Sequence, residues 1–281
     1  MEIGVTGLNA KATIGPDVTV RLARRAEELG YRSWWAGEHV VLPSPRTPDS
    51  PMAPTDPVLD PLVHLAFVAA ATSEIALGTA IVILPQRNPV VLAKQVASLD
   101  VLSGGRLRLG VGAGYLAPEM TAVGVPMRGR GERTDEYIDA MRSLWYDPAP
   151  VFRGRYTAFA DVDAHPRPAH PIPVVIGGHS PAAFRRAVTR GDGWFGNGDT
   201  PEDLERHLTG LARAAREHER GPAAPLEITW MQLRPTSQEQ IIRYRELGVD
   251  HLVFYPLPIE DPDDVERFLE RSRTDFDRAL R

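Results

Sequence analysis

Two adjacent side chains with acid–base chemistry, Glu38 and His39, follow the strand-like segment Trp34-Trp35-Ala36-Gly37. A histidine titrates near neutral pH and can give or take a proton, and a neighbouring carboxylate can orient the ring or favour its charged form. We therefore predict proton transfer at His39, with Glu38 in support. A hydrogen-bonded surface pair is the alternative interpretation of this spacing.

Glycines gather after two other strand-like segments. Leu107–Gly112 leads into Ala113 and Gly114, and Val174–Ile176 leads into Gly177-Gly178-His179-Ser180-Pro181. Glycines let the backbone approach a flat or phosphorylated ligand, and the bare amides of a helix start suit a phosphate. A tight turn is the alternative interpretation of each pattern, and His179 is either a phosphate ligand or the polar tip of its loop. The first pattern is not a Rossmann fingerprint, because it opens into the Tyr115–Gly131 loop instead of a helix.

Other candidate residues point away from metal chemistry. The chain contains no cysteine, and His64, His165, His170 and His251 lie in scattered segments without metal-ligand spacing. We predict no metal site, so redox chemistry here needs an organic cofactor. Trp194 either lines a ring-binding pocket or packs in the core.

The composition limits the class of protein. The 281 residues carry a formal charge of −5, which argues against a nucleic-acid footprint and favours a small-molecule partner. No linker or low-complexity segment divides the chain, so we expect one domain over residues 1–281. A leader and a long apolar run are both missing from the sequence, and we expect a soluble cytoplasmic protein without a membrane segment.

Short aliphatic runs alternate with helical patterns from end to end, as in parallel βα units. The predicted strands are Glu2–Gly7, Arg32–Ala36, Ile75–Ile83, Leu107–Gly112, Ile172–Ile176, Gly193–Phe195, Glu227–Met231 and Asp250–Phe254. This number closes a barrel, so the predicted fold is α/β, a (β/α)8 TIM barrel.

Helix boundaries are well marked in the sequence. A capping side chain followed by proline predicts helix starts at Asp60-Pro61, Asn88-Pro89, Ser180-Pro181, Thr200-Pro201 and Asp261-Pro262. Left-handed glycines are predicted to end helices at Gly30, Gly104, Gly191 and Gly248. Three connections are long: His39–Leu59, Gly114–Gly131 and Trp145–Pro171. The first follows a strand's carboxyl end and is either a lid over the active site or a plain surface loop.

Taken together, these segments resemble the luciferase-like monooxygenase family, and particularly its deazaflavin (F420) branch. The resemblance covers nearly the whole chain and is carried by Trp35–His39, Ile75–Thr79, Leu84–Pro89, Ala93–Leu107, Glu132–Tyr137, Ile176–Ser180 and Gly191–Trp194.

The resemblance implies a flavin-type ring in the barrel mouth against a bulge at Thr79, Ala80 and Ile81, which often holds a non-proline cis peptide. It places the cofactor phosphate at Gly112, Ala113, Gly114 and Tyr115 and at Gly177, Gly178, His179 and Ser180. His39 becomes the proton donor or acceptor, supported by Glu38. Sugar-phosphate dehydrogenases of this branch carry a glutamate where Tyr115 stands, which puts that particular chemistry in doubt.

The resemblance leaves three functions open. The first is an F420-dependent oxidoreductase that transfers a hydride to or from a C=C, C=N or C=O bond. The second is an FMN-dependent monooxygenase that uses O2, and the third is a flavin-binding protein without catalysis. Arg87, Arg128 and Arg130 are candidates for holding the anionic tail that F420 carries and FMN lacks. We also expect a homodimer.

Overall fold

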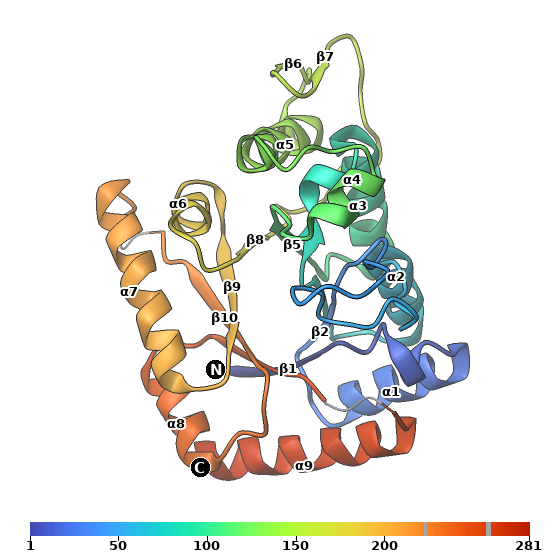
Figure 1. The fold of residues 1–281 in the computed structure, drawn as a ribbon, viewed down its shortest axis with the longest axis vertical. Helices are drawn as coiled ribbons and strands as arrows, with labels where there is room; N and C mark the ends of the chain where they lie inside the picture. Colours follow the sequence, from blue (N-terminus) through green and yellow to red (C-terminus); the bar gives the residue numbers. More distant parts are fainter. Residues whose placement is uncertain (222–223, 257–259) are drawn as a thin grey trace.

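The fold is a closed barrel of parallel strands surrounded by helices (Figure 1). The computed structural model describes residues 1–221, 224–256 and 260–281. The eight strands of the barrel are β1 (Glu2–Thr6), β2 (Ser33–Ala36), β3 (Ala76–Thr79), β5 (Leu107–Gly112), β8 (Val174–Gly177), β9 (Gly193–Gly198), β10 (Glu227–Gln232) and β11 (His251–Phe254). The predicted (β/α)8 architecture is confirmed.

Strand pairing runs in one circle. The order is β3-β2-β1-β11-β10-β9-β8-β5, and an additional pairing of β3 with β5 closes the ring. β1 lies beside β11 with Glu2 opposite His251, so the first and last strands are neighbours. Because all strands run in parallel, their carboxyl ends meet at one mouth of the barrel.

The third predicted strand is interrupted. Residues Ile75–Ile83 form β3 and a two-residue strand β4 (Val82–Ile83), separated by Ala80 and Ile81, which are joined by a cis peptide bond. β4 pairs with the end of β5, with Val82 opposite Val111. The bulge expected from the family resemblance is therefore present at the predicted residues.

Helices cover the outside of the barrel. They are α1 (Pro16–Glu28), α2 (Pro61–Ala71), α3 (Pro89–Ser103), α4 (Ala117–Ala122), α5 (Arg130–Tyr146), α6 (Pro181–Arg190), α7 (Pro201–Glu217), α8 (Gln238–Glu246) and α9 (Pro262–Leu280). All five predicted proline starts are confirmed, and in each the preceding residue accepts a backbone N–H with its side chain.

One predicted helix end is wrong. Gly30, Gly104 and Gly248 have positive φ, as the left-handed helix end requires, but Gly191 is extended with φ −91° and ψ 151°. A Cβ atom on Gly191 would lie 2.7 Å from the carbonyl oxygen of Ala187. Glycine is needed there for space instead of for backbone conformation.

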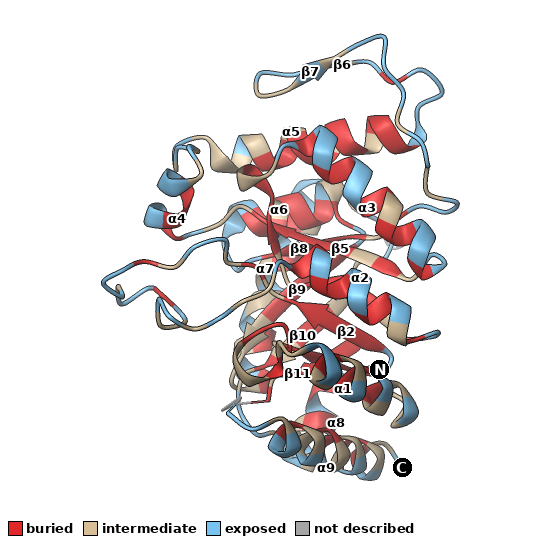
Figure 2. Cartoon of the chain, turned by 90° about the vertical axis from the view of Figure 1, so that its right-hand side faces the viewer, coloured by how far each residue is buried: buried red, intermediate tan, exposed pale blue. Residues whose placement is uncertain are grey.

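The core lies between strands and helices, where the barrel strands are almost continuously buried (Figure 2). Trp194, which was a candidate for a pocket wall, is fully buried and donates a hydrogen bond of 2.9 Å to the carbonyl oxygen of Gly178. Its ring packs against Trp230 and Phe184. The packing interpretation of Trp194 is therefore confirmed.

The three long connections differ in structure. The segment after Trp145 forms a small hairpin of β6 (Phe152–Arg153) and β7 (Ala158–Phe159), which stands beyond α5 and away from the barrel (Figure 1). The Gly114–Gly131 connection contains α4. The His39–Leu59 connection is tied at its end to the segment after β1, because Asn9 accepts the backbone N–H of Leu59 at its carbonyl and donates its side-chain amide to the carbonyl of Leu59.

Candidate active site

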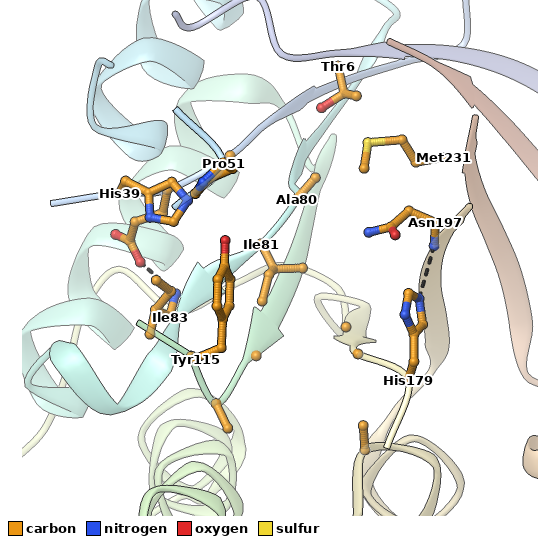
Figure 3. Close-up of a pocket in the computed structure, with 18 of the residues that line it drawn as sticks. Thr6, His39, Pro51, Ala80, Ile81, Ile83, Tyr115, His179, Asn197 and Met231 are labelled. Carbon is orange, nitrogen blue, oxygen red and sulfur yellow. Dashed lines mark hydrogen bonds between the residues drawn. The ribbon is translucent and has the colours of Figure 1, made fainter. Parts of the chain in front are cut away.

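A cavity of about 930 Å³ occupies the barrel mouth. It is large enough for a drug-sized or cofactor-sized ligand. The predicted site residues that line it are Glu38, His39, Ala80, Ile81, Gly112, Ala113, Gly114, Tyr115, Gly177, Gly178, His179 and Ser180. In Figure 3, His39 and His179 lie on opposite sides of the cavity, with Ala80 and Ile81 between them. The structure thus brings together residues from four strand ends.

Thr79 is the predicted site residue that does not line the cavity. Its side chain is fully buried, and its hydroxyl donates a hydrogen bond of 2.6 Å to the carbonyl oxygen of Gly110. This contact joins the end of β3 to β5 just before the bulge. Thr79 therefore holds the bulge in place from behind instead of facing the cavity.

The glycines of β5 and β8 make room for the bulge. A Cβ atom would lie 1.9 Å from Cδ1 of Ile81 if placed on Gly112, and 2.9 Å from Cγ2 of Ile81 if placed on Gly177. Both distances are shorter than atoms tolerate. The sequence pattern leaves these glycines open between access for a ligand and a tight turn. The first requirement that they meet is the seating of Ile81, which itself lines the cavity.

His39 lies at the end of β2 and contacts a carboxylate that the sequence did not single out. Its Nδ1 atom is 3.1 Å from Oε2 of Glu119, a residue of α4. The other oxygen of Glu119 accepts the backbone N–H of Val40 at 2.7 Å. Glu119 is buried, whereas the His39 side chain is 13% exposed and faces the cavity.

Glu38 does not take the role predicted for it. Its carboxylate accepts the backbone N–H of Ile83 at 2.5 Å and pairs with the guanidinium of Arg87, whose Nε lies 2.7 Å away. Burial raises the pKa of Glu38, although Arg87 opposes the shift. The prediction that Glu38 supports His39 is thus corrected: Glu38 anchors β4 and the segment behind it, and Glu119 contacts His39.

Tyr115 stands beside His39 at the mouth. The two rings meet edge-on with centroids 6.2 Å apart, and the tyrosine is about half exposed. Partial burial, together with the charges of Glu119 and Asp49, raises the pKa of Tyr115. Its hydroxyl therefore stays protonated at neutral pH and can donate a hydrogen bond into the cavity.

The opposite end of the cavity is suited to an anion. It is formed by Gly177, Gly178 and the start of α6, where Ser180 caps the helix through a bond of 3.2 Å from the N–H of Ala183. Two arginines also line the cavity: Arg130, and Arg186, which is paired with Asp135. Amides at a helix start combined with guanidinium groups are a recurrent setting for phosphate.

His179 is fixed at this end as a hydrogen-bond acceptor. Its Nε2 accepts the backbone N–H of Asn197 at 3.1 Å, and its ring stacks on His207 with centroids 4.2 Å apart. Although part of the ring is exposed, burial of the rest and the neighbouring His207 lower the pKa of His179 to about 4. A neutral His179 contributes polarity and shape here, and not a positive charge.

Several residues of the site were missed by sequence reasoning. Glu119 had one usable signal, a carboxylate in the otherwise apolar stretch Leu116-Ala117-Pro118-Glu119-Met120. The others line the cavity at positions that no motif marks; they include Asn9, Lys11, Met52, Asn197, Met231 and Tyr255. Such residues are placed by tertiary structure alone.

The fold and the site are together typical of one class of oxidoreductase. Its features are the parallel barrel, the interrupted third strand and an acid–base residue after β2. The luciferase-like monooxygenase family model matches residues 1–251, so the chain belongs to this family. It is an enzyme of the luciferase-like oxidoreductase class.

Two relatives illustrate the range of similarity. The protein Rv0953c of Mycobacterium tuberculosis is 33% identical over 287 residues, which cover 96% of this chain and 97% of the relative. The F420-dependent glucose-6-phosphate dehydrogenase of Amycolatopsis mediterranei is 28% identical over 89% of this chain and 83% of its own length.

Solved structures share the fold at lower identity. An F420-dependent secondary alcohol dehydrogenase in complex with an F420-acetone adduct superposes with a TM-score of 0.78 at 19% identity, covering 96% of this chain and 97% of the other. The monooxygenase RslO1 from Streptomyces bottropensis has a TM-score of 0.80 at 20% identity, with both chains covered completely. These similarities establish the fold and leave the cofactor open between deazaflavin and flavin.

Across residues 1–221, 224–256 and 260–281, no three His, Cys, Asp or Glu side chains gather in an arrangement that could hold a metal ion. In the same segments, no helix is long and apolar enough to cross a membrane.

Proposed function

We propose that the protein is an F420-dependent oxidoreductase that transfers a hydride between the deazaflavin and a small organic substrate. One observation carries this proposal: a cavity-facing histidine with a carboxylate partner lies across the bulge from an anion-binding end. This arrangement supplies a proton-transfer group and a phosphate site in a single cavity of suitable size.

The residues present fit an elongated cofactor with a phosphate. Gly178 and Ser180 at the start of α6 would hold the phosphate. Ala80 and Ile81 would support the flat ring from β3 and β4, because Ile81 is locked between Gly112 and Gly177. Reduced F420, when bound, supplies a hydride to an activated C=C, C=N or C=O bond.

Proton transfer is the part that this chain performs itself. His39 would protonate the substrate atom that does not receive the hydride, or remove that proton in the reverse direction. Tyr115 would hold a polar substrate atom by donating its hydroxyl proton in a hydrogen bond. The apolar side chains of Met52, Val58 and Met231 would keep water from the substrate.

The three arginines that are candidates for binding the anionic tail of F420 have different surroundings. Arg87 is paired with Glu38 and Asp60, and Arg128 is exposed and does not line the cavity. Arg130 lines the cavity between Gly129 and Gly131 and donates to the carbonyl oxygen of Gly114 at 3.1 Å. We therefore assign the contact with the charged tail to Arg130.

A titration tests the cofactor assignment. Purified protein is titrated with F420 and, separately, with FMN, in oxidised and reduced forms, and tryptophan quenching reports binding. Micromolar or tighter binding of F420, weakened about tenfold or more in Arg130→Met and unchanged in Arg128→Met, would support the proposal. Preference for reduced FMN with O2 consumption would instead favour a flavin monooxygenase. Binding of neither cofactor would overturn the assignment.

We also propose that the protein is a homodimer. The outward faces of α2 and α3 carry exposed apolar side chains, including Val63 at 69% and Leu102 at 77% exposure, together with Phe67 and Val91. α2 and α3 pack side by side, so these exposed residues lie on two neighbouring helices (Figure 2). Several large exposed apolar side chains on neighbouring helices are typical of a protein–protein contact.

A further inference from the structure

We propose that Glu119 is a positioning residue that fixes the tautomer of His39. In this account Glu119 keeps a proton on Nδ1, so that the neutral ring presents its unprotonated Nε2 to the cavity. The tautomer follows from the contacts of Glu119 and the hydrogen-bonding chemistry of a carboxylate, while its catalytic consequence depends on the proposed function.

Both carboxylate oxygens of Glu119 have a hydrogen-bond partner, which fixes the orientation of its side chain. One oxygen accepts the N–H of Val40 at 2.7 Å, and the other faces Nδ1 of His39 at 3.1 Å. An ionised carboxylate can only accept hydrogen bonds, so Nδ1 must be the donor. In a neutral imidazole the other ring nitrogen then carries the lone pair, which is the state that a general base requires.

The position of Glu119 is set independently of the His39 segment. Glu119 belongs to α4, in the connection between β5 and α5, 80 residues from His39 in sequence. The next residue, Met120, is fully buried, and its carbonyl accepts the N–H of Val125 at 2.9 Å. α4 is therefore held by its own packing, which fixes the position from which Glu119 contacts His39.

A purely structural role for Glu119 is the competing explanation, because the bond to Val40 alone could justify a buried carboxylate. Glu119→Gln separates the two roles. The amide oxygen of glutamine can still accept the N–H of Val40, while its NH2 group is turned toward Nδ1 of His39. A donor at this position requires Nδ1 to accept, so the ring proton moves to Nε2.

Nitrogen NMR of 15N-histidine-labelled protein without cofactor measures this directly. The spectrum is recorded at a pH where His39 is neutral, and the signals of His39 are those that disappear in His39→Asn. We expect the Nδ1–H tautomer in the wild type, its replacement by Nε2–H in Glu119→Gln, and no change in Glu132→Gln, a matched substitution of an exposed glutamate.

Two results would overturn the proposal: an Nε2–H tautomer in the wild-type protein, or an unchanged tautomer in folded Glu119→Gln. The wild-type spectrum alone decides the first, so the proposal is testable even when the variant does not fold. The measurement needs no cofactor, and failure of F420 to bind would count against the proposed function without touching the tautomer.

The kinetic consequence provides a second readout. A histidine held in the wrong tautomer cannot accept a proton at Nε2, which in a comparable carboxylate-to-amide change lowers kcat by orders of magnitude. For Glu119→Gln we expect kcat to fall by at least about 100-fold in the direction that needs a base, with the affinity for F420 unchanged. Loss of affinity with unchanged kcat would contradict a positioning role.

Discussion

A Cβ atom on Gly110 would lie 1.8 Å from the carbonyl oxygen of Thr79. The atom that such a Cβ would meet belongs to the backbone. The Thr79 hydroxyl holds this part of the backbone in place, because it donates a hydrogen bond of 2.6 Å to the carbonyl oxygen of Gly110. β3 and β5 are therefore in close contact where β3 ends, just before the residues that form the cavity wall.

The first prediction follows from this close approach. Gly110→Ala should lower the free energy of unfolding by about 3 kcal/mol, because overpacking against a fixed backbone must displace a strand. Denaturant unfolding measures the change. Gly15→Ala is the matched control, since Gly15 has φ −68° and a Cβ atom there would meet its nearest neighbour at an ordinary 3.8 Å. Equal stability of the two variants would contradict this account of the bulge.

The second prediction concerns the buried charge of Glu38. Arg87→Met removes the guanidinium that opposes the effect of burial, so the pKa of Glu38 should rise further above its ordinary range. Because the buried carboxylate then has no charged partner, the free energy of unfolding should fall by about 3 kcal/mol at pH 8. A raised carboxyl pKa means that the folded protein binds more protons than the unfolded chain, so stability should fall as the pH rises through this range.

The free energy of unfolding of Arg87→Met should therefore lie closer to that of the wild type at pH 5 than at pH 8, by about 1 kcal/mol or more. Unfolding in denaturant at the two pH values provides the comparison. The double variant Glu38→Gln with Arg87→Met carries no buried charge and should lose this pH dependence. A deficit that is the same at both pH values in the single variant would show that the charge of Glu38 is not responsible.

The third prediction tests the apolar surface of α2 and α3. Light scattering should give a dimer mass for the wild type and a monomer mass for the double variant Phe67→Glu with Leu102→Glu, because charges on a buried contact oppose association. Arg213→Glu, on the exposed face of α7, is the control and should stay dimeric. A wild-type protein that is monomeric would refute the proposed dimer.

Much of the fold could be predicted because its signals are local. Asp60, Asn88, Ser180, Thr200 and Asp261 cap helices at the expected positions, since capping depends on a residue and its immediate successors. Gly191 shows the limit of such reasoning. Its backbone is extended, and glycine is needed because the carbonyl of Ala187 leaves no room for a Cβ atom, which the sequence around it does not reveal.

The candidate site was predictable only in part. His39 and the glycine turns could be placed because residues that follow parallel strands gather at one mouth of a barrel. The partner of His39 could not, because adjacency in sequence favoured Glu38, whereas successive residues point in different directions at the end of a strand. Glu38 turns to Ile83 and Arg87, and the carboxylate that contacts His39 comes from α4.

The most direct test of the central claim is oxidation of reduced F420 by this protein in the absence of O2. The reaction is followed by the return of the F420 absorbance while small carbonyl, imine and activated alkene compounds are supplied one at a time. We predict turnover that depends on the added compound and not on O2, and a fall in kcat of about 100-fold or more in His39→Ala with F420 binding retained. Oxidation that requires O2 with either cofactor, or full turnover by His39→Ala, would contradict the account.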